Sequence, residues 1–307
     1  MSQPKWGEVM QKVWDAIVVG AGPAGASCAV WLRHLGLDPL LIEATDHIGG
    51  LAARNPFPDI WTVTSPDQTG VQVAEQIARQ VQAAAVPTWF DTRALSVAGH
   101  AGEFQLQIKR GEQASETVAA KTLVLATGVR PRELPGHEDT YYPGVIIGPG
   151  EAVMTTDFTG SRVALLGGGD NAFENHQFVK QRGATDAQIY ARTVRAQKQF
   201  VDRVSGQELI VGDPVVDPVA RTVNGQPYDW ILVLYGWQPN IGFIQDLSLR
   251  LDSRGFVQTD MQSAQTSVDG IYAIGELAQR MHPCVPTAMA DGVVAAKAIE
   301  ARLTGKT

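Results

Sequence analysis

Cysteine is nearly absent from this sequence, and so are long apolar runs and an excess of positive charge. Only Cys28 and Cys284 occur among the 307 residues, which excludes a disulfide framework and a cysteine-rich metal site. No apolar run is long enough to cross a bilayer, so we expect no membrane span. The 25 basic and 32 acidic residues give a net charge of −7, which argues against nucleic acid as the main partner.

The first residues have no continuous apolar core and carry Lys5, Glu8 and Lys12, so we expect no signal peptide and a cytoplasmic protein. Apolar residues recur at helical spacing in this segment, at Trp6, Val9, Met10, Val13 and Trp14. The spacing predicts a helix that docks on the protein's own body or on a twin subunit.

Two glycine-rich turns each follow a short apolar run. Residues 15–19 lead into Gly20, and residues 162–166 lead into Gly167. An apolar run, a glycine turn and a helix-compatible stretch are how a βαβ nucleotide-binding unit begins. Further buried strands are predicted at residues 39–42, 121–126, 230–234 and 271–274. Strands alternating with helices predict an α/β fold with parallel sheets.

The domain boundaries follow from the glycine turns and from the prolines. Proline and glycine crowd residues 131–150, which is typical of a hinge. We therefore predict one dinucleotide-binding domain in two pieces, residues 1–130 and 240–307. A second such domain, residues 131–239, is inserted between them.

The first turn fits the pattern G-x-G-x-x-G directly after a strand. Gly20 allows the tight turn, Gly22 lets a pyrophosphate approach the backbone, and Gly25 lets the next helix pack closely. The phosphates then lie at the positive N-terminus of that helix. Glu43 ends the next strand, roughly 20 residues after the turn, where a carboxylate accepts hydrogen bonds from ribose hydroxyls. The combination predicts a dinucleotide site.

Four further segments resemble the low-molecular-weight thioredoxin reductases, which have two dinucleotide-binding domains. These segments are Gly49-Gly50, Leu125–Gly128, Thr266–Glu276 and Tyr235–Asn240, and Thr287-Ala288 with Asp291-Gly292 echo the last helix of the family's FAD domain. The resemblance spans nearly the whole chain and implies bound FAD and a homodimer. It assigns FAD to Gly20, Gly22, Pro23, Ala24, Glu43, Gly49, Gly50, Leu51, Ala126, Thr127, Gly128, Gly275, Glu276, Val285 and Thr287.

The second turn implies a site for NAD(P)H or for a second flavin nucleotide. Its residues are Gly167, Gly168, Gly169, Asp170, Asn171 and Ala172, with Glu174 at the family's acidic position. The family's basic motif for the NADPH 2′-phosphate is reduced here to Arg192 and Arg195. If these two lie on a strand end, residues three apart face opposite sides and cannot grip one phosphate together. We then expect only a weak preference for NADPH over NADH.

The family's Cys-x-x-Cys pair is missing, because residues 145–160 contain no cysteine. Thioredoxin reductase activity by that route is therefore excluded. Cys28 is predicted to be a buried packing residue. Cys284 precedes a helix that should face the flavin, which favours thiolate, although a packing role is the preferred interpretation. His282 is a candidate proton donor, but for His282 and His176 alike we expect a solvent-exposed hydrogen-bonding role.

The sequence therefore predicts an FAD-dependent oxidoreductase that takes electrons from a second nucleotide. The acceptor is a small molecule, a quinone, oxygen or a carrier protein, and no metal is involved. Two alternatives stay open. One is a diflavin-type electron-transfer protein whose second site does not use NADPH, and the other is a non-catalytic flavin-binding sensor.

Overall fold

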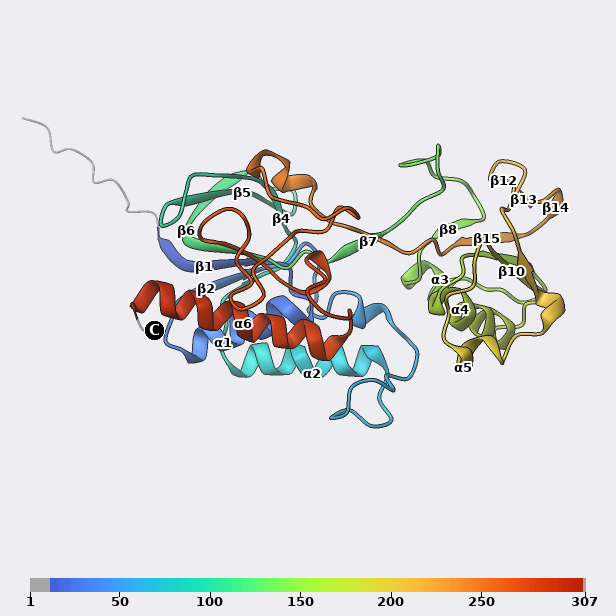
Figure 1. Cartoon of the computed structure of the whole chain (residues 1–307), viewed down its shortest axis with the longest axis horizontal. Coiled ribbons are helices and arrows are strands. Elements are labelled where there is room, and N and C mark those ends of the chain that lie inside the picture. The colour runs from blue at the N-terminus through green and yellow to red at the C-terminus, as the bar shows by residue number, and fades with distance from the viewer. Residues whose placement is uncertain (1–11, 306–307) are drawn as a thin grey trace, which may run out of the picture. The chain divides into compact units, whose positions relative to one another are not determined.

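The computed structural model describes residues 12–305, which divide into two compact units (Figure 1). The first unit holds the residues up to Gly128 together with those from Pro239 onward, and the second holds Val129–Gln238. The second unit is thus an insertion in the sequence of the first. Both units are built on sheets with parallel strands and flanking helices, so the predicted α/β fold is confirmed.

The sheet of the first unit has seven strands within the described residues, in the order β3-β2-β1-β6-β5-β4, with β17 beside β6. β1 pairs in parallel with β2 and β6, whereas β5 pairs antiparallel with β4 and β6. One edge of β6 is shared, because β5 pairs with it up to Ala120 and β17 pairs with it from Leu123. The strands are β1 (Val13–Val19), β2 (Pro39–Ile42), β3 (Thr88–Trp89), β4 (Thr92–Ala98), β5 (Phe104–Arg110), β6 (Glu116–Leu125) and β17 (Ile271–Ala273).

Long helices cover one face of this sheet, and the short helix η3 packs against the other (Figure 1). α1 and α6 touch backbone to backbone, since a Cβ on Gly292 would lie 2.5 Å from the carbonyl oxygen of Ala24. The elements are α1 (Pro23–His34), η1 (Ala52–Arg54), α2 (Gly70–Ala83), η3 (Gly242–Leu247), η4 (Gly275–Leu277) and α6 (Val285–Thr304).

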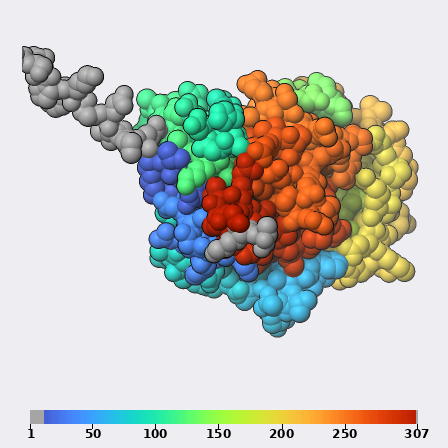
Figure 2. Space-filling model, turned by 60° about the vertical axis from the view of Figure 1, so that its left-hand side comes forward, coloured from blue at the N-terminus to red at the C-terminus, as the bar shows by residue number. Residues whose placement is uncertain are grey.

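The segment between η1 and α2 presents apolar side chains to solvent. Ile60 and Trp61 are exposed, and Val63 is 95% exposed. Figure 2 shows this segment, in light blue, projecting from the surface. An isolated β-bridge between Pro58 and Thr69 joins the two ends of this projecting segment.

The second unit has a parallel sheet in the order β11-β10-β9-β15-β8. Its strands are β8 (Val145–Ile147), β9 (Arg162–Leu166), β10 (Asp186–Ala191), β11 (Leu209–Val211) and β15 (Trp230–Val233). Its helices are α3 (Glu151–Thr155), α4 (Asp170–Gln181), α5 (Lys198–Val201) and η2 (Gly206–Glu208). A small antiparallel sheet adds β12 (Val216–Asp217), β13 (Thr222–Val223) and β14 (Gln226–Pro227), and β7 (Val129–Pro131) pairs with β16 (Trp237–Pro239).

The predicted strands are all present, and β2 and β9 have the predicted bounds. The predicted helix face at the start of the chain is wrong for Val13 and Trp14, which lie in β1, while Trp6, Val9 and Met10 lie outside the described residues. Val13 and Trp14 pair with Ala119 and Ala120 of β6, and the Trp14 ring meets Trp89 edge to face at 6.4 Å. Sheet pairing thus overrides the helical spacing. None of the described helices could cross a membrane.

Candidate functional site

The first glycine turn lies between β1 and α1, and two of its glycines are required by the fold itself. Gly20 has a φ of +103°, and a Cβ on it would lie 2.5 Å from the carbonyl oxygen of Ala126. A Cβ on Gly25 would lie 1.9 Å from the carbonyl oxygen of Gly20. Any larger residue at either position must displace backbone atoms.

Gly22 differs, because the nearest atom to a Cβ there is the Cα of Gly50 at 4.0 Å. Gly22 is the N-cap of α1, Pro23 follows it, and no side chain caps the helix or places a carboxylate in its first turn. The amides of the first turn are therefore free to bind an anion at the positive end of the helix. The open space at Gly22 is the space that a pyrophosphate against this backbone requires.

Glu43 follows β2 and is fixed beside this turn. Its Oε2 accepts a hydrogen bond from the amide of Ala21 at 2.8 Å, and its Oε1 accepts from the amide and the hydroxyl of Thr45 at 2.9 and 3.0 Å. A carboxylate has about four lone-pair directions, so acceptor capacity remains for ribose hydroxyls. The assignment of Glu43 to a ribose stays a prediction from the sequence.

Glu43→Ala is expected to weaken FAD binding by about 10- to 150-fold, because charge-assisted hydrogen bonds contribute ~1.5–3 kcal/mol. The measurement is FAD retention during dialysis, followed by titration of the apoprotein with FAD. Glu43→Gln is the comparison variant. It keeps one accepting oxygen without the charge, whereas its amide nitrogen faces the backbone N–H of Ala21 or Thr45, so its loss of affinity should be smaller than in Glu43→Ala. Equal affinity in the wild type and Glu43→Ala would remove Glu43 from the site.

The other residues assigned to the flavin on this side fall into two groups. Gly49 donates its amide to the carbonyl of Ala21 at 2.9 Å, and Gly50 packs on Gly22, so this glycine pair lies beside the first turn. Leu51 follows as the N-cap of η1. Ala126, Thr127 and Gly128 follow β6, where the hydroxyl of Thr127 donates to the carbonyl of Asn240 at 2.8 Å. The Thr127 side chain therefore binds the segment at Asn240, where the chain re-enters the first unit.

Gly275 and Glu276 begin η4, at the carboxyl end of β17. Glu276 lines a pocket with Cys284 and Thr287. Burial raises the pKa of the Glu276 carboxyl, and within residues 12–305 its carboxylate makes no hydrogen bond. Its carboxylate oxygens are not fully buried, so they can accept a hydrogen bond from a hydroxyl in the pocket. Glu276 therefore fits a hydroxyl-bearing ligand in this pocket.

Cys284 is the N-cap of α6, and Val285 is the first residue of that helix. The Sγ of Cys284 lies 3.3 Å from the Oγ1 of Thr287, whose hydroxyl lies 2.7 Å from the carbonyl oxygen of His282. His282 is exposed, as predicted. Cys284 and His282 thus both lie at the N-terminus of the 20-residue helix that lines the Glu276 pocket.

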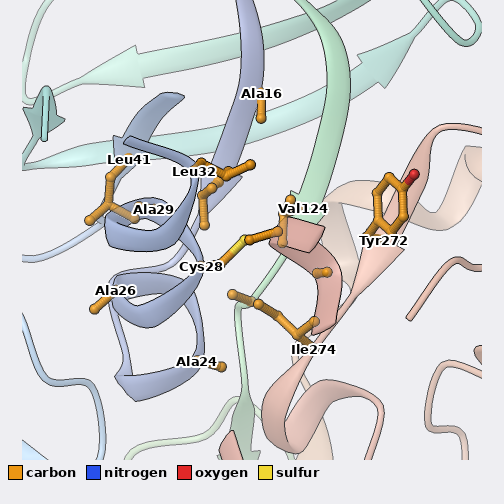
Figure 3. Packing of buried hydrophobic residues seen from close by; sticks show 14 of the residues in the cluster. Ala16, Ala24, Ala26, Cys28, Ala29, Leu32, Leu41, Val124, Tyr272 and Ile274 are labelled. Carbon is orange, nitrogen blue, oxygen red and sulfur yellow. The ribbon is translucent and has the colours of Figure 1, made fainter. Parts of the chain in front are cut away.

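Cys28 is fully buried on α1, and burial raises the pKa of its thiol. Figure 3 shows its side chain among Leu32, Val124 and Ile274. The predicted packing role is confirmed. Both cysteines are free thiols, and the part of the chain that the structure describes holds no cluster of three His, Cys, Asp or Glu able to bind a metal ion.

The second glycine turn lies between β9 and α4. Like the first, it has two glycines without room for a Cβ and one glycine with open space beside it. A Cβ on Gly167 would lie 2.4 Å from the carbonyl oxygen of Leu234, and one on Gly168 would lie 1.9 Å from that of Thr193. A Cβ on Gly169 would meet nothing within 4 Å. Gly169 is the N-cap of α4, and Ala172 is fully buried where the helix packs on the sheet. The open position again lies at a helix N-terminus, but here Asp170 places a carboxylate in the first turn of the helix, which α1 does not have.

The segment after β10 folds over this turn. The amides of Arg195 and Ala196 donate to the carbonyl of Gly168, at 2.6 and 3.0 Å. Asp170 accepts from the amide and the side chain of Gln197, at 2.8 and 2.9 Å. These bonds fix residues 193–197 against the glycine turn, which explains why Gly168 has no room for a side chain.

The assumption that Arg192 and Arg195 lie on a strand end is wrong, because β10 ends at Ala191, Arg192 follows in a bend, and Arg195 lies in irregular chain. Both side chains are exposed, and the Nε of Arg192 lies 3.9 Å from a carboxylate oxygen of Asp213. Strand alternation therefore says nothing about whether these two guanidinium groups reach one phosphate. Asn171 lies in the first turn of α4, where its carbonyl accepts from Asn175 at 2.7 Å.

The expectation of a solvent-exposed role for His176 is wrong. Its side chain is fully buried between α4 and β10, with Nε2 3.2 Å from the carbonyl oxygen of Ala187. Burial lowers the pKa of His176, and Glu208 opposes that shift. His176 is therefore a core residue rather than a ligand to the nucleotide.

Glu174, one turn into α4, is the most perturbed carboxyl of this unit. Burial and the charge of Asp170 raise its pKa to about 7, although Arg203 acts in the opposite direction. Its folded pKa lies above the unfolded value, so stability is fully present below about pH 4.5 and is lost as the pH rises through 7. At neutral pH the charged form is a cost to the fold.

Glu174→Gln is therefore expected to stabilise the protein at pH 8 and to leave it unchanged near pH 4.5. The full shift corresponds to ~3.4 kcal/mol, and solvent screening of this half-buried group reduces the gain to about 1–2 kcal/mol. The melting temperature of each variant at the two pH values is the measurement. Glu208→Gln is the control, because it removes the ion pair with Lys180 and should destabilise at pH 8. An equal gain for Glu174→Gln at both pH values would contradict the prediction.

Comparison with known proteins agrees with this arrangement over most of the chain. A family model described as pyridine nucleotide-disulphide oxidoreductase matches residues 14–292. The chain belongs to that family. The oxidoreductase is 31% identical to a ferredoxin–NADP reductase of Limosilactobacillus fermentum, over 87% of this chain and 86% of the relative. It is 24% identical to a thioredoxin reductase of Mycoplasma genitalium, over 93% and 94%.

Solved structures show the same fold. The thioredoxin reductase of Lactococcus lactis aligns with a TM-score of 0.80 over 95% of this oxidoreductase and 99% of the other chain, at 22% identity. Family membership makes this protein a thioredoxin reductase-like flavoprotein that uses FAD and NAD(P)H. Its residues fit these cofactors, because Gly22 and Gly169 leave space at two helix N-termini and Glu276 lacks a donor.

Proposed function

We propose that this oxidoreductase passes electrons from a pyridine nucleotide at the second glycine turn, through FAD in the first unit, to an acceptor other than a disulfide. The observation that carries the proposal is the state of its two thiols. Cys28 is fully buried, and Cys284 is a free thiol at the N-cap of α6. Thiol–disulfide exchange needs one thiol to attack and another to resolve, and the chain offers no such pair.

The roles of the residues follow from their positions. FAD supplies two-electron redox chemistry when bound. The N-terminus of α1 at Gly22 binds its pyrophosphate, and Glu43 accepts hydrogen bonds from its adenosine ribose. Glu276 would accept a hydrogen bond from a hydroxyl of its ribitol chain. The N-terminus of α4 at Gly169 binds the pyrophosphate of the second nucleotide.

The acceptor is proposed to be a carrier protein or small molecule that does not need thiol exchange. The relative in Limosilactobacillus fermentum bears the name of a ferredoxin–NADP reductase, which supports an electron carrier of that kind. The free thiols also fit a reducing compartment, so we place the protein in the cytoplasm, and the resemblance supports a homodimer.

The test is anaerobic titration of the purified, FAD-loaded protein with NADPH and with NADH, followed by addition of acceptors. We expect loss of the oxidised flavin absorbance with both nucleotides. The preference for NADPH should be about 10- to 150-fold if one of the two exposed arginines makes a single charge-assisted contact to the 2′-phosphate, because such a contact contributes ~1.5–3 kcal/mol. Reduction of ferricyanide or ferredoxin should follow, and reduction of thioredoxin should not.

Three other results of this titration would contradict the proposal or favour one of the alternatives. Robust NADPH-dependent reduction of thioredoxin would contradict the proposal and would require a redox role for Cys284. A yellow protein that responds to neither nucleotide would favour the diflavin alternative if two flavins per chain are extracted, and the sensor alternative if one is. A colourless protein that takes up no FAD would refute all three.

A further inference from the structure

The turn that carries Glu276 is held in place by a buried ion pair. Asp291 of α6 accepts from the amide of Gly275 with Oδ2, at 3.1 Å, and from Nη1 of Arg280 with Oδ1, at 2.8 Å. The Arg280 and Asp291 side chains are only 3% and 4% exposed. Removing two charges from water is costly unless they are paired with good geometry, so each fixes the other.

Arg280 also ties this turn to a separate segment of the chain. Its Nη2 donates to the carbonyls of Asp260 and Met261. Its Nε is buried and has no hydrogen-bond partner among residues 12–305. Arg280, Asp291 and Glu276 line the same pocket. A full positive and a full negative charge, both desolvated, therefore form part of the wall beside the carboxyl proposed to hold the ribitol chain.

We propose that Arg280 and Asp291 act as a charge-balanced positioning pair, which orients Glu276 through the Gly275 amide and keeps the electrostatic field at the bound flavin balanced, so that neither charge alone shifts its reduction potential. This inference rests on the proposed function. Two-electron reduction adds negative charge to the bound cofactor, so a nearby positive charge favours the reduced form and a nearby negative charge disfavours it. With the pair intact the two fields offset each other.

The test is to remove the two charges one at a time and measure the midpoint potential of the bound FAD. Asp291→Asn keeps an oxygen that accepts from Gly275 but leaves Arg280 uncompensated, so the potential should become more positive. Arg280→Met leaves Asp291 uncompensated, so the potential should become more negative. Each variant should change the equilibrium constant for reduction at least tenfold, which is about 30 mV for a two-electron couple.

Two controls separate the charge effect from general disturbance of the site. The double variant Arg280→Met/Asp291→Asn keeps the acceptor for Gly275 and removes both charges, so its potential should return close to the wild-type value. Arg302 and Asp269 form a bidentate pair on the surface, and Arg302 lies on α6 roughly 16 Å along the helix from Asp291. Arg302→Met and Asp269→Asn make the same charge changes there and should leave the potential unchanged.

Shifts of opposite sign in the two single variants, cancelled in the double variant, support the proposal. Shifts of the same sign, or no shift in folded and FAD-loaded variants, overturn it. If Asp291→Asn does not fold, Arg280→Met and the double variant still test the proposal. Only a charge effect lowers the midpoint potential in Arg280→Met and returns it to the wild-type value in the double variant. A wild-type protein without FAD would instead refute the proposed function.

Discussion

Gly25→Ala is expected to prevent the first unit from folding, whereas Gly22→Ala is expected to fold and to lose FAD. The two glycines belong to one motif but meet different neighbours. A Cβ on Gly25 would lie 1.9 Å from the carbonyl oxygen of Gly20, so α1 must move off β1. Such overpacking against backbone costs more than about 3 kcal/mol. A Cβ on Gly22 has 4.0 Å of free space and disturbs only a ligand.

The measurement compares thermal unfolding of the apoproteins with their uptake of FAD. Gly22→Ala should melt close to the wild type and bind FAD about 5- to 150-fold more weakly, since a methyl group in a close contact costs ~1–3 kcal/mol. Gly25→Ala should be insoluble or melt far lower. A Gly22→Ala protein that retains FAD at full affinity would show that the pyrophosphate lies elsewhere.

Gly168→Ala is expected to abolish the response to NAD(P)H and to destabilise the second unit. Its Cβ would lie 1.9 Å from the carbonyl oxygen of Thr193. The variant must therefore release residues 193–197, with the hydrogen bonds from Arg195 and Ala196 to the Gly168 carbonyl. Overpacking and the lost hydrogen bonds together amount to at least about 3 kcal/mol.

Gly169→Ala is the matched control for the same turn. No atom lies within 4 Å of its Cβ, and its φ of −99° is open to any residue, so the fold should be unaffected. Its nucleotide response should weaken by about 10- to 100-fold if the pyrophosphate lies against this backbone. Reduction of the flavin by NADH or NADPH, followed by absorbance, distinguishes the two variants. Equal loss of stability in both would contradict the steric argument.

The sequence predicts the strands and the two glycine turns because these features are local. β2 and β9 are short apolar runs that end at polar or glycine positions, and such runs are buried wherever a parallel sheet is covered on both faces. Glu43 could be placed because the spacing from the glycine turn to the end of β2 is set by one helix and one loop. Local rules of this kind need no knowledge of distant contacts.

The failures of sequence-based prediction involve distant partners. Trp14 carries a helical pattern, yet β6, far along the chain, pairs with it. His176 is buried by β10, and the bend at Arg192 depends on where that strand stops. The ion pair of Arg280 and Asp291 was not predicted, because Arg280 belongs to no motif and the motif that contains Asp291 does not indicate its partner. Tertiary contacts override propensity at such positions.

The shared edge of β6 has a consequence for biosynthesis. β5 and β17 lie along the same edge, but β17 follows the whole second unit in the chain. During synthesis, part of the β6 edge therefore stays unpaired until β17 has been made. Residues 129–238 emerge from the ribosome in the meantime and can fold as a unit. The face of α1 that packs on α6 is likewise uncovered until α6 has been made, because Gly292 of α6 packs on Ala24. An unpaired edge and an uncovered helix are the surfaces that chaperones bind, so the flavin unit is the vulnerable part of the nascent chain.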